Sequence, residues 1–108
     1  MKKALLFTAI TVLSLNAFAL TETSKCRKQV RYQLRTVQSD YPVEIGKGLE
    51  LPAGEKYVVN TQRVVGPFEE DAILYGYSGS YHSGSFGELA VVDPQTCKIE
   101  RTIEIYAE

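Results

Sequence analysis

Two cysteines, Cys26 and Cys97, constrain the fold of this 108-residue chain more than any other feature, and they are its only cysteines. In an oxidising compartment, an isolated pair this far apart predicts one structural disulfide. It would close a loop of about 72 residues, so both ends of the domain would have to lie side by side. A redox or metal-binding pair is the alternative, but the Cys-x-x-Cys spacing is missing and the single His82 does not complete a zinc site.

The start of the chain indicates that the protein is exported to an oxidising compartment. Two lysines precede an apolar run over residues 4–15, and residues 17–19 read Ala-Phe-Ala, the small-x-small pattern of a signal peptidase site. We therefore predict a cleaved signal peptide over residues 1–19 and a single small domain over residues 20–108. The short leader favours a periplasmic, or else secreted, protein of a Gram-negative bacterium. As an uncleaved anchor, the apolar run would be at the short limit for crossing a bilayer.

The segment from about Thr23 to Ser39 predicts an amphipathic helix. It contains neither glycine nor proline, and its apolar residues recur at spacings of four, four and three: Cys26, Val30, Leu34 and Val37. Basic side chains line another face of this helix. They form either an ordinary solvated surface or a candidate anion-binding patch for lipid headgroups, made by Arg27, Arg31 and Arg35.

After the helix, the sequence predicts four or five antiparallel strands separated by turns. The extended runs lie at residues 47–51, 55–65, 72–79, 86–92 and 97–106. The last run alternates apolar and polar side chains, with Arg101 as the one exception on its apolar face. We therefore predict an α+β fold with one disulfide, in which the helix packs on the sheet face that carries Ile99, Ile103 and Ile105.

A helix followed by a curled antiparallel sheet resembles the general layout of cystatin-like domains. The stretch from Val91 to Ile99 is also similar to the strand-turn-strand of PepSY-type domains, where a hydrophobic strand leads to Asp-x-x-Thr-Gly. Cys97 occupies the place of that glycine. The likeness covers nine residues, so it implies a local turn and no activity.

Residues 74–87, LYGYSGSYHSGSFG, are the candidate recognition segment. Tyrosine and serine on a glycine-rich backbone form adaptable contact surfaces. The segment is either a partner-binding loop or a hairpin tip whose tyrosines cover the sheet. No acid near His82 can orient its imidazole, so we expect no catalysis there. The candidate partner-binding residues are Tyr75, Tyr77, Tyr81, His82 and Phe86.

The charge balance narrows the function further. The chain has 12 basic and 13 acidic residues, and loss of the leader removes two of the basic ones, which argues against a nucleic-acid-binding protein. We expect a small exported binding or inhibitor-like module, not an enzyme, without cofactor or metal. Its partner would be a periplasmic or extracellular protein or glycan. The alternative is an accessory envelope protein held against anionic lipid by the basic helix face.

Overall fold

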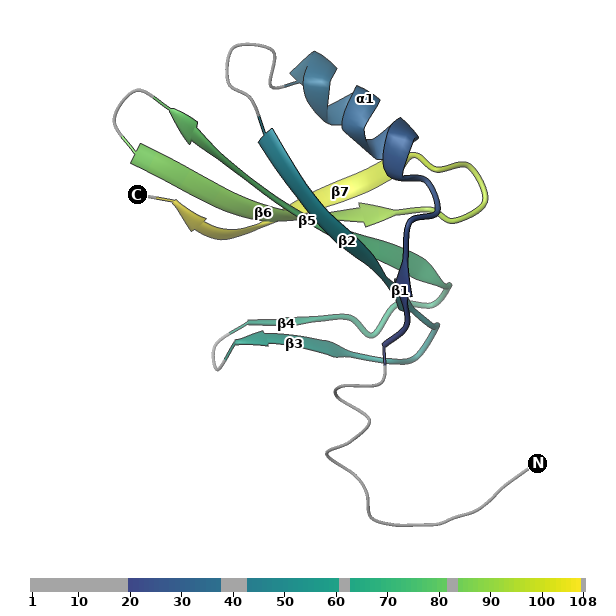
Figure 1. Cartoon of the computed structure of the whole chain (residues 1–108). Helices are drawn as coiled ribbons and strands as arrows, with labels where there is room; N and C mark the ends of the chain where they lie inside the picture. The colour runs from purple at the N-terminus through teal and green to yellow at the C-terminus, as the bar shows by residue number, and fades with distance from the viewer. Residues whose placement is uncertain (1–19, 38–42, 61–62, 82–83, 108) are drawn as a thin grey trace, which may run out of the picture.

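The computed structural model describes residues 20–37, 43–60, 63–81 and 84–107. The predicted leader, residues 1–19, lies outside the described residues. Within them, a single helix lies on one face of a five-stranded antiparallel sheet, and a separate two-stranded hairpin lies on the other face (Figure 1). No helix in these ranges is long and apolar enough to cross a bilayer. The predicted α+β class is confirmed.

The main sheet has the strand order β1-β2-β5-β6-β7, and each neighbouring pair is antiparallel. The strands β3 and β4 pair only with each other within the described part of the chain. The elements are β1 (Glu22–Thr23), α1 (Arg27–Val37), β2 (Val43–Leu51), β3 (Tyr57–Asn60), β4 (Arg63–Val65), β5 (Ala72–Tyr81), β6 (Gly84–Val92) and β7 (Ile99–Ala107).

The run at residues 55–65, predicted as one of the extended runs that follow residues 47–51, does not form a single strand. It divides into β3 and β4, while β2 pairs with β5 instead. The turn at residues 52–54 therefore sends the chain across to the other face of the sheet. Val65 is buried there, with Tyr57 and Val59 half-buried beside it. Their burial explains the arrangement, because the hairpin covers sheet residues that would otherwise expose apolar surface to water.

The helix begins later than predicted, because residues 22–23 join the sheet as β1. The chain then turns within three residues: the Lys25 amide donates to Oγ1 of Thr23 at 3.0 Å, and the Arg27 amide donates to the Ser24 carbonyl at 3.1 Å. Val30 is buried against the sheet as the helical periodicity predicts.

The sheet separates two apolar clusters, so the molecule has three layers. Buried residues on the helix side are Cys26, Val30, Leu34, Ile73, Tyr75, Tyr77, Phe86, Ala90 and Val92. Buried residues on the hairpin side are Leu51, Val65, Ala72, Leu74, Leu89 and Val91. Both faces of β5 and β6 are therefore covered, which explains why these strands contain so many apolar residues at successive positions.

The face of β7 that meets the helix differs from the prediction. Ile99 packs on the helix side, whereas Ile103 and Ile105 pack on the hairpin side. The pairing register of β7 shifts between Val91 and Val92 of the neighbouring strand, which places an extra residue in β7. Such a β-bulge interrupts the alternation of faces, so the side chains beyond it point to the opposite side from a regular strand.

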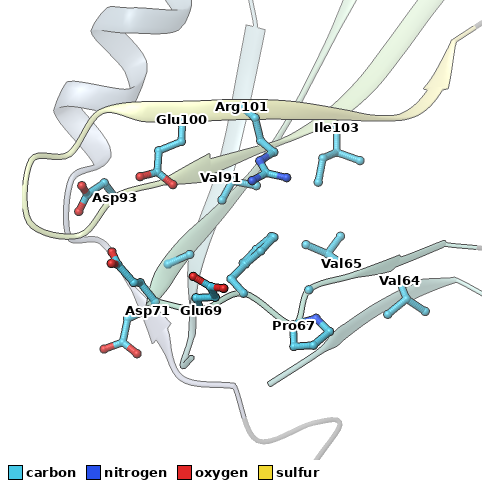
Figure 2. A pocket seen from close by; sticks show the side chains of 14 residues that line it. Val64, Val65, Pro67, Glu69, Asp71, Val91, Asp93, Glu100, Arg101 and Ile103 are labelled. Atoms are coloured by element: carbon cyan, nitrogen blue, oxygen red, sulfur yellow. The ribbon is translucent and has the colours of Figure 1, made fainter. Parts of the chain in front are cut away.

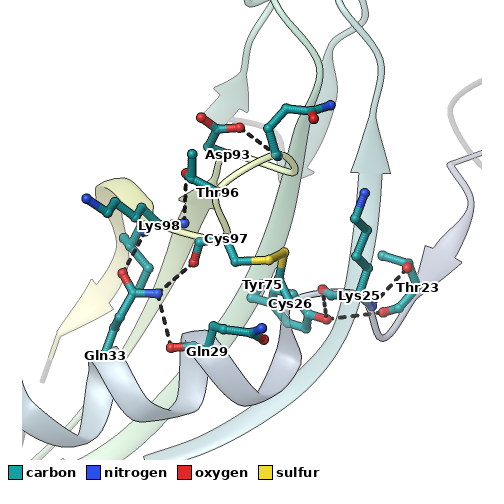
Figure 3. The surroundings of a disulfide bond; sticks show 12 residues. Thr23, Lys25, Cys26, Gln29, Gln33, Tyr75, Asp93, Thr96, Cys97 and Lys98 are labelled. Carbon is teal, nitrogen blue, oxygen red and sulfur yellow. Dashed lines mark hydrogen bonds between the residues drawn. A yellow bond between two sulfur atoms is a disulfide. The ribbon is translucent and has the colours of Figure 1, made fainter.

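The predicted disulfide is present. Cys26 and Cys97 join the turn before α1 to the turn before β7, with their Cα atoms 5.2 Å apart (Figure 3). Both cysteines have positive φ, 70° and 62°, in the left-handed region that favours glycine. Cys97, which stands where the PepSY-type motif has glycine, donates its amide to the Asp93 carbonyl at 2.7 Å. The local turn therefore requires the conformation that glycine adopts most easily.

Loss of the disulfide should destabilise the domain substantially. The two cysteines are 71 residues apart in sequence, so replacing both by serine (Cys26→Ser with Cys97→Ser) should lower the free energy of unfolding by about 4 kcal/mol on the chain-entropy model. Urea denaturation of the oxidised wild type and of the double variant measures this difference. A change below about 1 kcal/mol would contradict the structural role.

Two glycines on the main sheet should respond differently to alanine. A Cβ on Gly48 would lie 2.7 Å from Cζ of Tyr75 and 3.0 Å from the Thr23 carbonyl oxygen. A Cβ on Gly76 would have Cδ2 of Leu89 as its nearest neighbour, at 4.0 Å. Gly48→Ala should cost about 1–3 kcal/mol, because the buried Tyr75 ring cannot move aside. Gly76→Ala should leave the unfolding free energy equal or slightly higher. Thermal and urea denaturation of both variants provide the test, and equal stabilities would refute the packing argument.

Candidate functional site

The candidate recognition segment is mostly strand. Residues 74–81 belong to β5 and residues 84–87 to β6. The side chains of Tyr75, Tyr77 and Phe86 are buried on the helix side, with 0%, 5% and 9% exposure. Tyr81 is the last residue of β5, but its side chain lies outside the described residues, as does His82. The three buried aromatic residues are therefore not available to a partner that approaches from solvent.

The buried tyrosines instead stabilise the fold. The Tyr75 hydroxyl donates to the Lys25 carbonyl at 2.7 Å, and burial raises the pKa of this phenol. The Tyr77 hydroxyl donates to the Glu88 carboxylate. Burial and this carboxylate together raise the pKa of Tyr77 far above the ordinary value for tyrosine. The Tyr77 ring also meets Phe86 edge-on, with ring centroids 6.3 Å apart.

The three arginines proposed as an anion-binding patch lie in different surroundings. The Arg27 guanidinium donates to the Ile45 carbonyl at 2.8 Å and to the Gly46 carbonyl at 2.5 Å. These carbonyls lie where β2 bulges away from β5, so Arg27 joins the start of the helix to an irregular stretch of the sheet. Arg31 and Arg35 are exposed on the outer side of α1. Arg27 is therefore set apart from Arg31 and Arg35 by its bonds to the sheet, and anion binding by the three stays a prediction.

A groove lies on the hairpin side of the sheet, away from the sequence-predicted site residues (Figure 2). Its volume is about 650 Å³, within the range of natural ligand sites. The end of β4 and the following loop, residues 66–71, form one wall, and β7 forms the other. In this loop Gly66 has a φ of 88°, and an added Cβ would lie 2.8 Å from the Glu55 carbonyl oxygen, so only glycine fits this turn.

The groove is acidic at one end and apolar at the other. Figure 2 shows Glu69, Asp71, Asp93 and Glu100 gathered at one end, and Val64, Val65, Pro67 and Ile103 toward the opposite end. With Glu70, five carboxylates line it. Arg101 lies between the two ends, its guanidinium carbon 5.3 Å from the centre of the Phe68 ring. We call this site the acidic groove.

Two of the five carboxylates already bind backbone amides. Asp71 accepts a hydrogen bond from the Ala53 amide at 2.9 Å, and Asp93 accepts one from the Gln95 amide at 2.8 Å. Glu69, Glu70 and Glu100 are exposed at the groove. Glu69, Glu70 and Glu100 are thus the groups best placed to meet an approaching cation.

Sequence reasoning did not find the acidic groove. The acidic run at residues 69–71 has the appearance of a solvated loop, and only the fold brings it opposite Glu100. One signal was present: Arg101 interrupts the apolar face of the last strand. A charged residue on an apolar face indicates either a shift in strand register or a binding site. Arg101 lies next to the register shift of β7 and also lines the acidic groove.

The polar groups that line the groove are carboxylates and one guanidinium. No serine, threonine, cysteine, histidine, lysine or tyrosine is among the described residues that line it. Across the described part of the chain, no group of three or more histidine, cysteine, aspartate or glutamate side chains is arranged to hold a metal ion. The arrangement offers a cation-attracting end, an apolar end and one guanidinium between them. A ligand with a basic group beside an apolar one matches this pattern.

Arg27 and Arg31 should differ in their effect on stability. Arg27→Ala removes two hydrogen bonds from a charged donor to backbone carbonyls and should lower the unfolding free energy by about 1–2 kcal/mol. Arg31→Ala, on the exposed side of the same helix, should change it by less than about 0.5 kcal/mol. Urea denaturation of the two variants makes the comparison. Equal effects would mean that Arg27 has no special structural role.

No protein-family model, no curated protein and no solved structure matches this chain.

Proposed function

We propose that this chain is a small exported protein that acts by binding rather than by catalysis, and that the acidic groove is its binding site. The observation that carries the proposal is the polarity of the groove, in which exposed carboxylates at one end face apolar side chains at the other. Export is supported by the signal-peptide pattern of residues 1–19 and is compatible with the Cys26–Cys97 disulfide.

The proposed ligand is an extended segment of a partner protein, with a basic side chain next to an apolar one. The groove runs along β7, which is the last strand of the described sheet. An edge strand offers backbone groups to which an extended peptide can add as a further strand. Carboxylates attract a lysine or arginine of such a segment more strongly than they attract a neutral glycan. A protein partner is therefore favoured over a glycan.

The backbone of β7 supports this mode of binding. Gln33 bonds the carbonyl of Cys97 and the amide of Ile99, and Arg63 donates to the Glu104 carbonyl. These side chains cover the two ends of a short stretch, residues 100–103, of which Glu100, Arg101 and Ile103 line the acidic groove. The stretch is therefore the part of β7 at which the groove and the strand edge meet.

A cystatin-like layout is part of the proposal. The element order supports it, because one helix follows an edge strand and is followed by antiparallel strands that are successive neighbours in the sheet. The hairpin of β3 and β4 is an addition between β2 and β5. An inhibitor-like role would have the acidic groove hold an extended segment of the target enzyme.

The proposal is tested with a short peptide of alternating lysine and valine as the probe. Titration calorimetry should detect binding to the wild-type protein that weakens as salt is added, because exposed charges are screened. A variant that neutralises the three exposed groove carboxylates, Glu69→Gln with Glu70→Gln and Glu100→Gln, should bind the peptide roughly tenfold or more weakly.

A matched variant separates the groove from net charge. Glu44→Gln with Glu55→Gln and Glu104→Gln removes the same number of charges from exposed positions that do not line the acidic groove. This variant should bind like the wild type. If both triple variants weaken binding equally, or if the wild type does not bind the peptide, the acidic groove is not the site we propose.

A further inference from the structure

The outer side of α1 is basic and carries one exposed aromatic ring. Its four residues are all exposed, and we call them the outer helix face: Lys28, Arg31, Tyr32 and Arg35. Tyr32 has 68% of its surface exposed, more than the other large hydrophobic side chains exposed in the described part of the chain. A large ring left in water among cations has no role in the core, because Val30 and Leu34 on the opposite side of the helix provide the packing.

The positive charge of this face is not offset locally. No acidic residue occurs from Thr23 to Val37. The one ion pair found among the described residues joins Lys47 to Glu22, which does not involve the helix. The outer helix face therefore presents uncompensated positive charge to its surroundings.

Five carboxylates gather on the other side of the sheet, in the acidic groove. The acidic groove is built on the cluster that includes Val65 and Val91, while α1 packs on the cluster that includes Val30 and Ala90. Near an anionic surface, the helix side is therefore attracted and the groove side is repelled. This asymmetry fixes the orientation in which the molecule would approach.

We propose that the outer helix face docks the domain on an anionic phospholipid surface, with the acidic groove facing away from it. The helix lies on the outside of the sheet (Figure 1), and its four outer residues are exposed there. Lysine and arginine side chains attract anionic headgroups, and a tyrosine ring between them suits the depth of the headgroups. This inference goes beyond the acidic groove as a binding site and does not depend on it.

A single tryptophan reports on the docking. The chain has no tryptophan, so Tyr32→Trp introduces the only one. With vesicles of phosphatidylcholine and phosphatidylglycerol, its emission should shift to shorter wavelength, and high salt should reverse the shift. Tyr106→Trp is the matched control, because Tyr106 is also exposed, at 44%, but lies on the hairpin side. Its emission should not change.

Charge reversal tests which cations act. Arg31→Glu should weaken vesicle binding roughly tenfold in a co-sedimentation assay, since it removes one attraction and adds one repulsion. Lys56→Glu makes the same change of net charge at an exposed position just before β3 and should bind nearly as the wild type does. Circular dichroism of both variants checks that the fold is retained.

Four results would overturn the inference. In the co-sedimentation assay, they are a wild type that does not bind the anionic vesicles, and equal weakening of binding by Arg31→Glu and Lys56→Glu. In the fluorescence assay, they are an emission shift of the Tyr32→Trp variant that is equally large with vesicles of phosphatidylcholine alone, and the same shift with soluble heparin. The last would indicate a general polyanion surface rather than a lipid-docking face. The variant with Glu69, Glu70 and Glu100 changed to glutamine should keep vesicle binding, so failure at the groove and failure at the helix are distinguishable.

Discussion

The Cys26–Cys97 disulfide is the interaction on which the rest of the structure depends. A helix of 11 residues is marginal in water without tertiary contacts, and this bond holds its start against the sheet. Gln33, seven residues after Cys26 and therefore on the same side of the helix, adds a second link. Its side-chain Nε2 donates to the Cys97 carbonyl at 2.7 Å, and its Oε1 accepts from the Ile99 backbone amide at 2.9 Å (Figure 3). The helix is thus fixed to the start of β7 at two points.

Fixing the helix on one face leaves the other face of the sheet to the β3–β4 hairpin. A two-stranded hairpin is weakly stable alone, and bonds to its neighbours anchor this one, such as Arg63 to the Glu104 carbonyl and Gly54 to the Phe68 carbonyl. So small a hairpin cannot cover the whole face. The acidic groove forms where its cover ends, between the loop after β4 and the strand β7.

The features that could be predicted from the sequence are those set by local periodicity or by the cysteines. The helix, the disulfide and the approximate positions of most strands follow from such patterns. The side of the sheet that Ile103 faces does not, because a bulge in β7 breaks the alternation. Tyr75 and Tyr77 alternate with small residues as in a strand buried on one face, but their proximity to several glycines and serines also fits a loop. The groove joins residues 64–72 to residues 91–103, and a pairing at that distance has no local signal.

The formal net charge of −1 conceals how the charges are arranged. Layers in such a fold pack about 10 Å apart, so the outer helix face and the acidic groove, on opposite sides of the sheet, are separated by about 20 Å. The Debye length at physiological ionic strength is about 8 Å, so dissolved salt largely screens the interaction between the two surfaces. A near-neutral chain can therefore present a positive face and a negative groove that act separately. A partner bound in the groove would not compete with a surface that binds the helix.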